Sequence, residues 1–107
     1  MNHEKIAREI HNTGRSCATS VYEAFRDINK NTSRAPSPRA EGGKCGAVLA
    51  AEKVLKETGT GRIEEFDSQF LKKFGSLKCH ELLGGRYSCH ELVGIAARIT
   101  DELCSTR

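Results

Sequence analysis

The segment CGAVLAAEKVLKE, residues 45–57, is the part of the chain that decides the fold. From Cys45 onward its pattern is typical of a helix, and Gly59 and Gly61 follow where such a helix would end. Its small residues fall on one side of the helix. We therefore expect a neighbouring helix to approach this side closely.

Helical periodicity continues on both sides of this segment, and strand-like alternation is nearly absent. Within residues 1–14 the pattern indicates a short, fraying helix that stops at Gly14, and Ser16 can cap a second helix. Further helices are predicted over residues 63–74 and from Ser88 to about Cys104. The positions expected to share one buried face are Cys17, Val21, Phe25 and Ile28 in the second helix, Ile63, Phe66, Phe70 and Phe74 in the later one, and Cys89, Leu92, Val93, Ala96, Ile99 and Leu103 in the last.

Residues 31–44, NTSRAPSPRAEGGK, contain Pro36, Pro38 and the pair Gly42 and Gly43. Because prolines and paired glycines interrupt a helix, we expect a long mobile loop here. A chain of 107 residues is one domain by size. The sequence therefore predicts a single all-α domain, a small bundle of four to five helices with one long loop that contains proline and glycine.

Charge and hydropathy exclude several classes of function. The formal net charge is +3, and the basic and acidic residues are interspersed, so no basic stripe for nucleic acid is present. No stretch approaches the roughly 20 apolar residues that span a bilayer, and the first twelve residues are too polar for a signal peptide. We expect a cytoplasmic protein that binds neither nucleic acid nor membrane.

The segment KCHELLGGRYSCHELVG, residues 78–94, contains the unit Cys-His-Glu-Leu twice. Its second copy follows Ser88, and Ser88 with Glu91 forms a capping box, which explains part of the repeat as helix-start chemistry. A capping box does not require the cysteines at positions 79 and 89. We therefore ask what a cysteine does at the beginning of a helix.

Four of the five cysteines are expected where helices begin: Cys17, Cys45, Cys79 and Cys89. A helix N-terminus carries unpaired N–H groups and about half a positive charge, which favours a thiolate and lowers a cysteine pKa from about 8.5 toward 7 or below. Such a cysteine is nucleophilic at neutral pH. Cys104 follows Asp101 and Glu102 at the end of a helix, where packing is its expected role.

Three interpretations of these cysteines are open. The first is reversible dithiol–disulfide chemistry, in which one thiolate attacks and a second resolves. The second is a zinc site or an iron–sulfur cluster on Cys17, Cys45, Cys79 and Cys89, with His80 or His90 able to replace one of them, although no short C-x(2–4)-C spacing is present. The third is a helical interaction module in which the cysteines only pack.

The order of the motifs resembles a known family. Cys17 within SCATSVYEAF, Cys45 within GGKCGAVLAA, Cys79 within FGSLKCHELLG and Cys89 at the start of the last helix are together similar to the C_GCAxxG_C_C family, and the likeness extends from about Ser16 to Leu103. The resemblance implies an all-helical protein in a redox role whose four cysteines correspond to these positions. It leaves the substrate and cofactor undefined.

The leading hypothesis is a thiol-based redox protein that carries out dithiol–disulfide exchange or electron transfer with the four helix-start cysteines. Proximity in the sequence pairs Cys79 with Cys89 and Cys17 with Cys45, and cross-pairing stays open. The expected partner is a redox protein or a small thiol. The cofactor is left open between none, zinc and an iron–sulfur cluster.

Overall fold

The computed structural model describes residues 3–29, 45–78, 81–82 and 87–105. Within these ranges the chain folds into five helices and forms no strand: α1 (His3–Asn12), α2 (Cys17–Ala24), α4 (Gly46–Glu57), α5 (Ile63–Phe74) and α7 (Cys89–Ser105). The predicted small all-α bundle is confirmed. The loop predicted over residues 31–44 lies outside the described residues.

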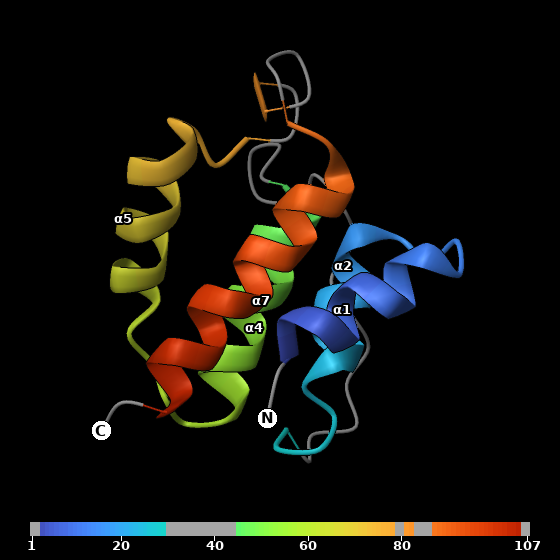
Figure 1. The fold of residues 1–107 in the computed structure, drawn as a ribbon. Coiled ribbons are helices and arrows are strands. Elements are labelled where there is room, and N and C mark those ends of the chain that lie inside the picture. The colour runs from blue at the N-terminus through green and yellow to red at the C-terminus, as the bar shows by residue number, and fades with distance from the viewer. Residues whose placement is uncertain (1–2, 30–44, 79–80, 83–86, 106–107) are drawn as a thin grey trace.

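Helix α7 organises the bundle because it contacts each of the other four helices. Figure 1 shows α4 and α7 side by side and running in the same direction, with α5 on one side of them and α1 and α2 on the other. Helix α2 packs against both α4 and α7, and α1 packs against α2 and α7. The beginnings of α2, α4 and α7 consequently lie toward the same end of the molecule (Figure 1).

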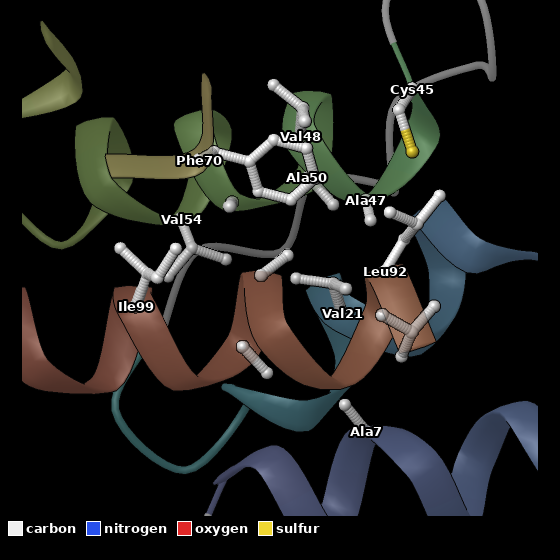
Figure 2. Packing of buried hydrophobic residues seen from close by; sticks show 14 of the residues in the cluster. Ala7, Val21, Cys45, Ala47, Val48, Ala50, Val54, Phe70, Leu92 and Ile99 are labelled. Atoms are coloured by element: carbon white, nitrogen blue, oxygen red, sulfur yellow. The ribbon is translucent and has the colours of Figure 1, made fainter. Parts of the chain in front are cut away.

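Helix α4 is buried over its whole first half, as its small residues predict. Every residue from Gly46 to Ala51 is buried, and so are Val54 and Leu55. Figure 2 shows residues around it that come from α2, α5 and α7: Val21, Phe70, Leu92 and Ile99. Each fully buried Val or Leu contributes about 1.5–3 kcal/mol through the removal of apolar surface from water. The small side chains of α4 allow these neighbours to reach it.

The aromatic face predicted for residues 63–74 is confirmed in α5. Phe66, Phe70 and Phe74 are buried and form a ladder with ring centroids 5.7 and 4.7 Å apart. The helix ends at Gly75, which has a φ of 82° and donates its N–H to the carbonyl of Leu71. None of the helices in the described part of the chain combines the length and the apolar character needed to cross a membrane.

The face predicted for the second helix is wrong at one position. Val21 and Phe25 are fully buried, but Ile28 is 41% exposed. Helix α2 ends at Ala24 with Phe25 as its C-cap, and the N–H of Asn29 then bonds to the carbonyl of Phe25 in a turn. Because the backbone leaves helical geometry after Ala24, the helical spacing that placed Ile28 on the buried face no longer applies.

Helix α1 is held at its start by a buried histidine. His3 is 4% exposed and stacks on Phe25, with ring centroids 4.3 Å apart. Its Nδ1 lies 2.9 Å from an oxygen of Asp101 in α7, and its Nε2 lies 3.0 Å from an oxygen of Asp27 in the turn after α2. One imidazole thus joins three separate parts of the chain. Buried polar groups paired in this way are costly to disrupt.

We predict that His3→Ala lowers the free energy of unfolding by about 1–3 kcal/mol, because two carboxylates lose a partner and Phe25 loses a stacked ring. Urea unfolding followed by circular dichroism measures the change. Glu9→Ala, at an exposed position of the same helix, is the control and should change stability by less than about 0.5 kcal/mol. Equal effects of the two substitutions would show that His3 does not anchor α1.

Candidate functional site

The start of α2 is fixed by Ser16, as the sequence predicts. Ser16 is the N-cap, with φ −65° and ψ 161°, and its Oγ accepts the N–H of Thr19 at 3.1 Å. Cys17 is therefore the first residue of the helix. Its side chain lies beside the N–H groups that a helix leaves unpaired at this end.

Cys45 stands at the start of α4, one position earlier relative to its helix than Cys17. It is the N-cap residue, with φ −57° and ψ 137°, and its carbonyl accepts the N–H of Leu49 at 3.0 Å. Its own N–H donates to the carbonyl of Leu77 at 2.8 Å, which fixes the backbone of Cys45 against the segment after α5. The Cys45 side chain is 2% exposed, whereas Cys17 is only partly buried.

Gly46 lets these two helix starts meet. A Cβ placed on Gly46 would lie 2.8 Å from the Sγ of Cys17, and 3.2 Å from both the backbone nitrogen and the Cβ of Ala18. Contacts below 3.0 Å are essentially absent from real structures, so no other residue fits here without movement. The glycine after Cys45 thus determines how near α4 comes to Cys17.

The two sulfurs share one hydrogen bond. The side-chain contact with Cys45, together with the N–H groups of Ala18 and Ala47, lowers the pKa of Cys17 to about 6, although burial acts in the opposite direction. The same contact and burial raise the pKa of Cys45 well above its ordinary value. These opposite shifts favour the thiolate on Cys17 and the thiol on Cys45. Neither residue is in a disulfide.

The structure gives fewer contacts for the other cysteines considered in the sequence. Cys89 is the first residue of α7 and is partly buried. Ser88 caps this helix by accepting the N–H of Glu91 at 3.2 Å, as the capping box predicts. Cys104 lies in the last turn of α7, with its Sγ 3.5 Å from Oγ1 of Thr60. Cys79 and His80 lie outside the described residues.

The described residues do not assemble a metal site of the kind considered above. Among them, no group of three or more His, Cys, Asp or Glu side chains is arranged to hold a metal ion. His90 lies beside His11 of α1, with 3.3 Å between their Nδ1 atoms. A site on all four cysteines would include Cys79, which lies outside the described residues.

Sequence reasoning missed three contributors to these arrangements. Gly46 reads as one more small residue of α4, and nothing in the sequence shows that its Cα faces a sulfur. Ala47 contributes only its backbone N–H to Cys17, which no side-chain pattern reveals. His11 is separated by 79 positions from the histidine that it contacts, so no local spacing indicates the pair.

Comparisons of the chain with models of known protein families, with curated proteins and with solved structures find no match. The function is therefore argued from the residues of this chain.

We predict that Gly46→Ala lowers stability by about 1–3 kcal/mol through overpacking, after an offset of at most about 1 kcal/mol from the better helix propensity of alanine. By pushing α4 away from Cys17 it should also raise the pKa of Cys17, measured by the pH dependence of alkylation. Gly59→Ala is the matched control. Its φ of 76° makes alanine unfavourable, but a Cβ there meets nothing within 4 Å, so it should cost stability without changing the pKa of Cys17.

Proposed function

We propose that this protein carries out thiol-based redox chemistry in which Cys17 and Cys45 alternate between a dithiol and a disulfide. The observation that supports this most directly is the close approach of the two helix starts at Gly46, which brings the side chains of Cys17 and Cys45 into contact. It supplies, next to each other, a nucleophile that is ionised at neutral pH and a second sulfur able to release the product. Both are required for reversible disulfide exchange.

The proposed reaction begins with attack by the Cys17 thiolate on one sulfur of a substrate disulfide. A bond forms between the Cys17 Sγ and that sulfur, the substrate S–S bond breaks, and the departing sulfur leaves as a thiolate that takes a proton from water. Cys45 then loses its proton and attacks the Cys17 Sγ. The second half of the substrate leaves as a thiolate, and a Cys17–Cys45 disulfide remains. The substrate gains two electrons and the protein loses two.

The charges on the two sulfurs suit this order of events. A thiolate with a pKa near 6 is mostly ionised at pH 7 and is still a better nucleophile than a more acidic one. Once Cys17 has joined a substrate sulfur it no longer carries a negative charge. The interaction that holds the proton on Cys45 is then lost, so the pKa of Cys45 falls when its thiolate is needed.

The exposure of the two cysteines also agrees with Cys17 as the attacking residue and Cys45 as the resolving residue. Cys17 is partly exposed and can meet a substrate, whereas Cys45 at 2% exposure is reached through Cys17. In this proposal the substrate is the disulfide of a small thiol or of a partner protein. The likeness to the C_GCAxxG_C_C family extends the proposed redox role to Cys79 and Cys89, and their proximity in the sequence makes them the second pair. The cytoplasm is the proposed location, because its reducing poise returns the pair to the dithiol.

We expect alkylation of Cys17 by iodoacetamide to rise with pH and to reach half its maximum near pH 6, because only the thiolate reacts. Cys45→Ala removes the side chain that lowers the pKa of Cys17 most, so the midpoint should move up toward about 8.5. Peptide mapping by mass spectrometry assigns the modified residue. Cys104→Ala is the control and should leave the midpoint unchanged. A Cys17 midpoint at or above the ordinary value in the unaltered protein would overturn the proposal.

A second prediction concerns the resolving step. Glutathione disulfide should convert the unaltered protein to a form that contains a Cys17–Cys45 disulfide, without glutathione retained on Cys17. Cys45→Ala should stop at the mixed disulfide, so that Cys17 keeps one glutathione. Digestion under non-reducing conditions followed by mass spectrometry distinguishes these products. The resolving role of Cys45 would be refuted by equal retention of glutathione on Cys17 in the two proteins.

A further inference from the structure

Two histidines that do not belong to the cysteine pair connect α1 with the beginning of α7. His11 is in the last turn of α1, and His90 is the second residue of α7. Their Nδ1 atoms are 3.3 Å apart, and the ring centroids are separated by 5.4 Å with 38° between the ring planes. Both rings are partly buried. In the present arrangement one Nδ1 donates a hydrogen bond and the other accepts it.

Arg8 fixes the backbones that carry these rings. It lies one turn before His11, and its Nη1 donates to the carbonyl of His90 at 3.3 Å. The guanidinium also covers Gly94, where an added Cβ would lie 2.1 Å from the Cζ of Arg8. Glu4 balances its charge, with one carboxylate oxygen 3.0 Å from Nη2. The end of α1 is therefore held against the first turns of α7 by contacts that do not involve the imidazoles.

The separation of the two nitrogens matches a coordination geometry. Zinc binds imidazole nitrogen at about 2.0–2.1 Å and prefers a tetrahedral shell, in which two ligand atoms are about 3.3–3.4 Å apart. The two Nδ1 atoms already have this spacing. We infer that His11 and His90 form a binding site for a divalent transition-metal ion of borderline softness, such as zinc, with one Nδ1 ligand from each ring.

Two neutral imidazoles are the form that binds a metal ion, because each ring must then offer an Nδ1 lone pair. When the ion enters, the hydrogen that lies between the two Nδ1 atoms moves to an Nε2, and both Nδ1 lone pairs become ligands. Two coordination positions are left for water or for an added ligand. Of the charged groups near the pair, Arg8 contacts the His90 carbonyl and Glu4 pairs with Arg8.

This inference does not depend on the proposed redox function, because it uses neither Cys17 nor Cys45. It also differs from a site on the four cysteines, since both ligands are nitrogens. Two nitrogens alone make a modest site, so the ion should exchange with the medium. Its expected effect is to fasten α1 to α7.

Cobalt(II) tests the inference because it takes the place of zinc and has a visible spectrum that reports its ligands. The reduced full-length protein should bind one cobalt ion with the ligand-field bands of a tetrahedral site and without the near-ultraviolet charge-transfer band of a cobalt–thiolate bond. Zinc should displace the cobalt. A strong thiolate band, or no binding by the reduced protein, would overturn the inference.

Variants assign the ligands. His11→Ala and His90→Ala should each weaken cobalt binding at least tenfold, with circular dichroism showing that the helices are retained. The double variant Cys17→Ala, Cys45→Ala is the control and should bind cobalt as the unaltered protein does. Unchanged binding in either histidine variant would refute the site. Because the control lacks the redox pair, the result does not depend on whether the redox proposal is correct.

Discussion

The close approach of α2 and α4 at Gly46 is the constraint on which the candidate site depends. The helix that follows Cys45 can meet Cys17 only because position 46 has no side chain, since a Cβ there would lie 2.8 Å from the Cys17 sulfur. Through this contact the two cysteines shift each other's pKa, downward for Cys17 and upward for Cys45. Two chemically identical side chains are thereby made different, one acidic and reachable, the other weakly acidic and buried. Backbone packing, more than any charged side chain, sets this difference.

The two cysteines show that a helix N-terminus does not act on a sulfur by its dipole alone. Cys17 and Cys45 both stand where a helix begins, and backbone N–H groups lower the pKa of each. The net pKa shifts of the two cysteines are nevertheless opposite in direction. The contact between the two side chains lowers the pKa of Cys17 and raises that of Cys45, and burial raises the pKa of Cys45 further. A prediction made from helix starts alone would lower the pKa of both residues, whereas the contact with Cys17 and burial raise the pKa of Cys45.

The sequence predicted the features that repeat over short distances. The aromatic ladder of α5, the small buried face of α4 and the caps at Ser16 and Ser88 follow from local spacing and from side-chain chemistry. Ile28 was misplaced because helical spacing was extended past the end of α2. The contacts of His3 with Asp27 and Asp101, and of His11 with His90, join residues far apart in the chain. Such polar contacts depend on how the helices pack against one another, and local spacing in the sequence does not predict that arrangement.

Those two polar contacts also explain how α1 is attached. Only Ala7 among its apolar residues is fully buried, and Ile6 and Ile10 pack at the edge of the core. Apolar burial by this helix is therefore small, and polar contacts secure it at both ends, through His3 near its start and through His11 near its end. Hydrogen bonds and charge pairs respond to protons and to bound ions more strongly than apolar packing does. Helix α1 is therefore joined to the rest of the bundle by polar contacts at both ends, in addition to the packing of Ile6, Ala7 and Ile10.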